Sequence, residues 1–124
     1  MKKFICSKVK FIEDRFVISI VDGTLSLTAG KTMEVIDLVN ASIEEELSQS
    51  FSGKKVIQTL KVDGDFGTIV ANRLMSPLIF ELTLSDGTKV IWGDKDIRCK
   101  IKSQNLTAGQ GVINFERQTT SFQF

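Results

Sequence analysis

One stretch of the sequence decides the fold class: Leu78-Ile79-Phe80-Glu81-Leu82-Thr83-Leu84-Ser85-Asp86-Gly87-Thr88-Lys89-Val90-Ile91-Trp92. In its first half, Phe80, Leu82 and Leu84 alternate with polar residues, which is the pattern of a strand with one buried face. Asp86-Gly87 then suits a tight type I′ turn, because both central positions of that turn need positive φ. We therefore predict a β-hairpin between residues 78–85 and 88–92.

The rest of the chain favours strands in the same way. It contains 13 Ile, 10 Val, 10 Thr and 9 Phe but only 4 Ala, so strand formers outnumber the best helix former. Further alternating sets predict more strands: Phe16, Ile18 and Ile20; Val56, Leu60 and Val62; Ile113 and Phe115. We predict a mainly β fold, a single-domain antiparallel β-sandwich or barrel over residues 1–124, with about seven to nine strands and one short helix.

Acidic turn signals predict how these strands are connected. Asp22-Gly23 is predicted to turn a hairpin. Glu13-Asp14 is predicted to turn an opening hairpin between residues 3–11 and 15–21. Asp63-Gly64 is predicted to end a strand, since both residue types are common at turns.

The middle of the chain allows two interpretations. Across residues 33–51, Ile36, Val39, Ile43, Leu47 and Phe51 recur at spacings of three or four, which is typical of a helix stripe. A capping box in Ser42-Ile43-Glu44-Glu45 favours a short helix over residues 43–51. A strand remains open as the alternative, because Ile43, Leu47 and Phe51 also share one parity.

Composition excludes several classes of function. The chain has 124 residues, the size of one domain. Its net charge of +1 predicts no overall electrostatic attraction to nucleic acid or to an anionic membrane. It has no histidine, which removes His-containing triads and His-ligated zinc. Cys6 and Cys99 are predicted to be buried reduced thiols, with a single bridge as the alternative. We expect no signal peptide, no membrane-spanning segment and a cytoplasmic site of synthesis.

Three sets of residues are candidate interfaces. Ile97-Arg98-Cys99-Lys100-Ile101-Lys102 alternates strictly, which places Arg98, Lys100 and Lys102 on one strand face. Glu44, Glu45 and Glu46 form the obvious complementary acidic run. Phe122 and Phe124 close the sequence given, where polar residues are more usual, and indicate a docked final strand. The alternative for both charged sets is an ordinary solvated face.

No motif here assigns a catalytic, cofactor or metal site. Ala29-Gly30-Lys31-Thr32 resembles the end of a phosphate-binding loop, but Leu25 stands where its first glycine belongs. The carboxylates of Asp63-Gly64-Asp65 and Asp94-Lys95-Asp96 do not follow the spacing of a calcium loop, and turn chemistry explains such residues. We therefore predict a protein that is not an enzyme and needs no cofactor.

In organisation, the chain resembles bacteriophage tail structural proteins of the tail-tube class. The resemblance rests on an opening hairpin over Phe4–Val21, the Thr24–Thr32 loop, the acidic segment Glu44–Glu46 that leads to Gly53-Lys54-Lys55-Val56-Ile57-Gln58-Thr59-Leu60, and a closing β-hairpin with terminal strands that end in Phe115-Glu116-Arg117-Gln118-Thr119-Thr120-Ser121-Phe122-Gln123-Phe124. It implies a hexameric ring in the virion tail that stacks into a hollow tube. The implied partners are other copies, other tail proteins, and DNA as non-specific passing cargo, with no membrane. Glu44, Glu45 and Glu46 facing the lumen would keep DNA from adhering.

The leading hypothesis is thus a self-assembling, non-enzymatic structural subunit. The alternative is a small β-barrel adaptor or binding module, such as a head–tail connector or tail terminator, with a concave pocket lined by Phe and Trp92. An enzyme is the third hypothesis and would need carboxylates such as Asp65 and Asp94 to meet in a cleft.

Overall fold

The fold is mainly β, as predicted, with 75% of the described residues in strands and 4% in helix. The structure is a computed structural model and describes residues 2–21, 23–51, 53–67, 75–94 and 99–120. The described elements are β1 (Lys2–Glu13), a 3-10 turn η1 (Asp14–Phe16), β2 (Val17–Val21), β3 (Thr24–Leu27), β4 (Glu34–Val35), β5 (Asp37–Ser50), β6 (Gly53–Asp65), β7 (Leu78–Leu84), β8 (Lys89–Trp92), β9 (Lys100–Thr107) and β10 (Gln110–Thr119).

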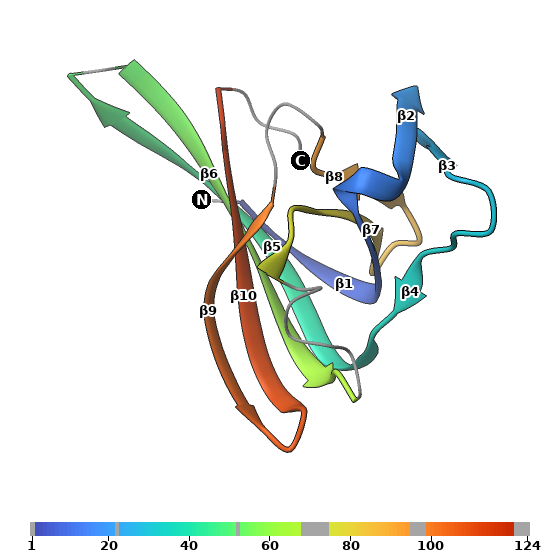
Figure 1. The fold of residues 1–124 in the computed structure, drawn as a ribbon. Coiled ribbons are helices and arrows are strands. Elements are labelled where there is room, and N and C mark those ends of the chain that lie inside the picture. Colours follow the sequence, from blue (N-terminus) through green and yellow to red (C-terminus); the bar gives the residue numbers. More distant parts are fainter. Residues whose placement is uncertain (1, 22, 52, 68–74, 95–98, 121–124) are drawn as a thin grey trace.

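Nearly all strands belong to one antiparallel sheet (Figure 1). Its order is β8-β7-β1-β5-β6-β10-β9, and the short β4 pairs with β1 beyond the end of the β1–β5 ladder. The hairpin β2–β3 forms a separate sheet of two strands. The strands β1, β5, β6 and β10 are long, and such strands twist strongly and allow a sheet to curl.

The large sheet curls until distant strands touch across its inner face. β7 and β10 are four strand spacings apart, about 19 Å in a flat sheet. Yet the ring centroids of Phe80 on β7 and Phe115 on β10 lie 4.8 Å apart. A single bridge between Leu78 and Cys99 also joins the two ends of the curl, although the sheet does not close into a barrel.

The main core fills the inside of this curl. Alternating residues of every long strand point inward, so that apolar side chains from opposite ends of the sheet meet. Its largest fully buried members are Trp92, Phe11, Phe80, Phe115, Ile43, Leu60, Leu78, Leu82 and Ile113. Each such side chain stabilises the fold by about 1.5–3 kcal/mol through its removal from water.

A second, smaller core lies on the outer face of β1 and β7. Ile12, Val17 and Ile79 are buried there under the β2–β3 hairpin. Because the hairpin covers this side, Leu78, Ile79 and Phe80 are all buried although they alternate in direction. The molecule is therefore sandwich-like in this region, with the hairpin as its second layer.

Two of the predicted hairpins are confirmed. β7 and β8 pair around Asp86-Gly87, where the Thr88 amide donates to the Asp86 carboxylate at 2.8 Å and lowers the pKa of Asp86. β2 and β3 pair on either side of the turn predicted at Asp22-Gly23, with Val21 opposite Thr24.

The predicted opening hairpin is wrong. β1 continues to Glu13, which pairs with Leu78 on β7, and the chain then turns through η1. The Asp14 amide donates to the Pro77 carbonyl at 2.9 Å, which ties this turn to the start of β7. A pairing with a strand distant in sequence has therefore replaced the local hairpin.

The predicted strand end at Asp63-Gly64 is also wrong, because β6 continues to Asp65. Gly64 is needed for a close approach between strands instead of for a turn. A Cβ atom at this position would collide with the Asp37 carbonyl oxygen of β5.

The helix predicted over residues 43–51 is a strand. Residues 43–50 lie in β5, which pairs with β1 on one side and β6 on the other, and Phe51 lies in the turn that follows. Ala41, Ile43 and Glu45 are buried at every second position, so the shared parity was the correct signal and the spacing of three and four was a coincidence. Two neighbouring strands supply backbone partners that outweigh the helical preference of the glutamates.

Candidate functional site

A row of polar side chains crosses the inner face of the sheet. Glu45 on β5, Gln58 on β6 and Arg117 on β10 stand side by side, since Gln58 is the register partner of both other residues. Glu45 and Gln58 have no exposed surface, and Arg117 is 7% exposed. Buried polar groups on an otherwise apolar face require hydrogen bonds to be tolerated.

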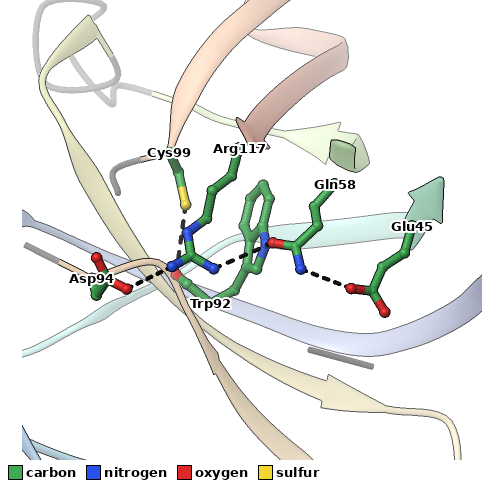
Figure 2. Close-up of polar contacts among 6 residues, drawn as sticks. All are labelled: Glu45, Gln58, Trp92, Asp94, Cys99 and Arg117. Carbon is green, nitrogen blue, oxygen red and sulfur yellow. Dashed lines mark hydrogen bonds and ion pairs between the residues drawn. The ribbon is translucent and has the colours of Figure 1, made fainter. Parts of the chain in front are cut away.

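Gln58 is the centre of this row (Figure 2). Its Nε2 donates to Glu45 Oε2 at 2.8 Å, while its Oε1 accepts from Trp92 Nε1 at 2.7 Å and from an Arg117 guanidinium nitrogen at 3.3 Å. Trp92 comes from β8, at the opposite end of the sheet order. Gln58 therefore joins the two ends of the curled sheet.

The row ends at the protein surface on Asp94. Arg117 donates to Asp94 Oδ2 at 2.6 Å, and the Asp94 side chain is 45% exposed. The Cys99 thiol lies next to this pair and donates to the Trp92 carbonyl at 3.6 Å. Burial raises the pKa of Cys99, and it raises the pKa of Cys6 to about 11, so both thiols are held neutral. Both are free and buried, as predicted.

These contacts hold distant strands of the sheet together, and we call the set the clamp. Its members are Glu45, Gln58, Trp92, Asp94 and Arg117. Each polar group in it is occupied by a neighbour within the chain, and the charge of Arg117 is compensated by Asp94. The prediction missed the clamp although its signal was present, because Gln58 shares the parity of Val56, Leu60 and Val62. A polar residue at a core parity is informative, since it needs a partner.

The acidic run does not form one surface. Glu45 points into the core, so the expectation that all three glutamates face solvent, a lumen or a partner is wrong for Glu45. Because side chains alternate along a strand, Glu44 and Glu46 share the outer face. Glu44 already forms an ion pair with Lys3 at 3.6 Å. The interface role of Glu44 and Glu46 stays a prediction.

The basic strand is confirmed only for its second half. Lys100 and Lys102 are exposed on β9, at one edge of the sheet, and Lys102 pairs with Glu116 at 3.6 Å. Arg98, Phe122 and Phe124 lie outside the described residues.

The two charged sets are not brought together within one chain. β6 and β10 separate β5 from β9, which places the two strands about 14 Å apart along the sheet. Any pairing between the acidic and the basic set would therefore have to involve another molecule.

The carboxylates considered for catalysis lie at different places. Asp65 accepts from the Gly67 amide at 2.7 Å, whereas Asp94 belongs to the clamp beside Arg117. Asp65 is seven residues beyond Gln58 on β6, so about 23 Å of strand separates the two sites. Within the described part of the chain, no group of three potential metal ligands occurs.

The loop that resembles a phosphate-binding loop holds a cation–π contact. The Lys31 ammonium lies 4.3 Å from the centroid of the Phe16 ring. This contact fixes the loop against η1, and Lys31 stays exposed beside it.

Among the described residues, the most exposed apolar feature is a projecting hairpin that the sequence pattern did not indicate. The outermost pairs made by neighbouring strands are Lys2 with Glu45 and Thr119 with Val56. Residues 46–51 and 53–55 extend beyond them, and we call this segment the arm; Figure 1 shows its two strands, the ends of β5 and β6, reaching away from the body. Phe51 at its end is fully exposed, and Leu47 is 44% exposed.

Comparison with known proteins leaves the family open, since no family model, curated protein or solved structure matches the chain. The similarity to tail-tube proteins therefore stays a prediction. In the described residues, no helix has the length and apolar character needed to cross a bilayer.

Proposed function

We propose that the chain is a non-enzymatic structural subunit that self-assembles, in the manner of a phage tail-tube-like ring component that forms a conduit for DNA. The arm is the observation that carries this proposal. Phe51 is fully exposed at the end of a projecting hairpin, and exposure of its ring to water is unfavourable. Burial of the ring in a contact with another molecule would lower the free energy. Exposed apolar surface of this kind marks interaction sites.

The open sheet edges support the same proposal. β8 and β9 end the order of the described strands in the large sheet, and an edge strand is a place where a further strand can pair. Lys100 and Lys102 are exposed on β9 and disfavour indiscriminate edge pairing by their charge. A subunit that assembles in one defined way needs both properties.

The rival hypothesis of an adaptor with an aromatic pocket has less support. Its expected lining residues, such as Phe80, Phe115 and Trp92, have no exposed surface because they fill the core. Their role is to hold the curled sheet together, which leaves the arm and the edges as surfaces for contact.

The test is the solution mass of the purified, untagged protein. Light scattering over a concentration series, with negative-stain images of the largest species, would detect rings or tubes. We expect the mass to rise with concentration in steps of one subunit until a ring closes. A monomer at every concentration would contradict the proposal and favour the adaptor hypothesis.

A further inference from the structure

Two irregularities in neighbouring strands lie beside an open hollow in the protein surface. β1 shifts its register between Cys6 and Lys8, and β5 shifts its register between Leu38 and Asn40. The hollow has a volume of about 400 Å³. It is lined by Ser7, Lys8, Val35, Ile36, Asp37 and Leu38, and we call it the bulge hollow. Bulges are frequently placed where a sheet presents a functional surface.

The bulge hollow is surrounded by exposed apolar side chains. Val35 in its lining is 53% exposed, and Val39 beside it is 74% exposed. Ile5, on the strand that borders the hollow, is 52% exposed. Three large apolar side chains exposed in one region of a sheet form a surface that a partner can cover.

The end of the arm is suited to such a surface. Ser50 pairs with Gly53, so the connection between β5 and β6 is two residues long and includes Phe51. Tight turns favour Asn, Asp or Gly, so turn geometry does not explain a phenylalanine. A residue that departs from local preference and is fully exposed points to a role outside the monomer.

We propose that Phe51 of one copy seats in the bulge hollow of a second copy. This inference rests on the proposed function and names the interface through which the subunits join. The charges on the two surfaces are complementary. The arm carries Glu46 and the exposed Lys54 and Lys55, while the hollow carries Lys8 and the exposed Asp37. Glu46 of the arm is opposite in charge to Lys8 of the hollow, and Lys54 and Lys55 of the arm are opposite in charge to Asp37.

The partner has to be another copy, because the arm cannot reach the hollow of its own chain. Both features lie on β5, with Asp37 at one end and the arm at the other. The 14 residues of β5 span about 43 Å as a strand. Because the arm and the hollow are different surfaces, copies can join head to tail, and such heterologous contacts build rings when they close and filaments when they do not.

The test uses two variants, each of which removes one side of the contact. Phe51→Ser removes the inserted side chain, and Val35→Lys fills the hollow with a charge; both positions are exposed, so the fold tolerates them. We expect each variant alone to associate at least about tenfold more weakly than the wild type, since an aromatic anchor dominates such interfaces. Ile18→Ser on β2 is the matched control, since Ile18 is 65% exposed and belongs to neither the arm nor the lining of the hollow, and it should assemble as the wild type does.

A mixture of the two variants gives the sharpest result. A Phe51→Ser copy keeps its hollow and a Val35→Lys copy keeps its arm, so together they can form one contact and no more. Light scattering should show a heterodimer in the mixture and monomers in each separate sample. A mixture that stays monomeric, or a Phe51→Ser variant that assembles like a competent wild type, would overturn this interface while leaving the proposed function in place. A wild type that stays monomeric would overturn both.

Crosslinking provides an independent measurement. A chain with Gln49→Cys and Val39→Cys together keeps Phe51 in place and should give a ladder of disulfide-linked oligomers on mild oxidation, since Gln49 and Val39 are both exposed. Each single variant should give no ladder beyond the dimer. The two native thiols do not interfere, because both are buried. Absence of the ladder in protein that assembles would contradict the proposed contact.

Discussion

Replacement of Gln58 by leucine should weaken the fold more than any other isosteric change on β6. Gln58 is fully buried and holds three partners: it donates to Glu45, and it accepts from Trp92 and from Arg117. Leucine has a similar volume and no polar atom, although its side chain is one heavy atom smaller and branches one carbon earlier. The variant therefore keeps an apolar group of similar size in the core and removes the centre of the clamp.

The magnitude follows from the groups left without this partner. The indole N–H of Trp92 loses its acceptor, and burial without a partner costs about 1–3 kcal/mol for such a group. The buried carboxylate of Glu45 loses the hydrogen bond that it accepts from Gln58, and loss of a hydrogen bond to a charged group costs about 1.5–3 kcal/mol. Arg117 loses its weaker 3.3 Å contact but keeps Asp94. We expect a total loss of about 3–5 kcal/mol, a large share of the roughly 5–15 kcal/mol that stabilise a domain.

Urea unfolding followed by tryptophan fluorescence measures this loss. Trp92 is the only tryptophan and is itself part of the clamp, so its emission reports the transition directly. At a slope of about 2 kcal/mol per molar urea, the midpoint should fall by about 1.5–2.5 M, measured at concentrations where the protein is monomeric.

Gln104→Leu is the matched control, because Gln104 is exposed on β9 and its replacement should change stability by less than about 0.5 kcal/mol. If Gln58→Leu lost less than about 1 kcal/mol with an unchanged slope, the reasoning about the clamp would be refuted.

The remaining predictions concern the thiols, a close approach of strands and the aromatic core. Iodoacetamide should modify Cys6 at pH 8 about a hundredfold more slowly than an exposed thiol, since burial raises its pKa from 9.0 to about 11. Mass spectrometry would show this, and fast labelling of the folded protein would contradict it. The Cys6 thiol has a lower pKa in the unfolded chain than in the folded one. The free energy of unfolding should therefore be constant below about pH 9 and fall as the pH rises toward 11. Gly64→Ala should cost about 1–3 kcal/mol in thermal unfolding, because its Cβ would collide with the Asp37 carbonyl; an unchanged melting temperature would argue against that contact. Phe80→Ala should cost about 3–5 kcal/mol in urea, since its ring contacts three others, and a loss under about 1 kcal/mol would disprove its central place in the core.

Local patterns predicted the strands well and their partners less well. Phe80, Leu82 and Leu84 alternate because one face of β7 is buried, and that signal lies within seven residues. The Asp86-Gly87 hairpin needs only neighbouring residues as well. The pairing of Glu13 with Leu78 joins residues far apart in sequence, and no local pattern records it. Strand order is thus set by distant contacts, which periodicity does not encode.

The candidate surface residues were likewise predicted correctly only where the signal is local. Lys100 and Lys102 were recognised as exposed because alternation with Ile101 is a local property. Glu45 was misassigned, because the helix hypothesis placed it in solvent, whereas strand parity places it beside Gln58. Phe51 could have been recognised: the helix hypothesis counted it in an apolar stripe, but it is a lone apolar residue between Ser48-Gln49-Ser50 and Ser52-Gly53.

The order of strands in the large sheet also determines when the chain is able to fold during synthesis. β10 lies between β6 and β9 and brings Phe115 against Phe80, so the interior lacks one wall until that segment is available. On the ribosome, the first ninety or so residues would expose the open flank of β6 and the side chains that β10 later covers. Pairings this distant in sequence form slowly, which makes the nascent chain a candidate client for chaperones that shield unpaired strands.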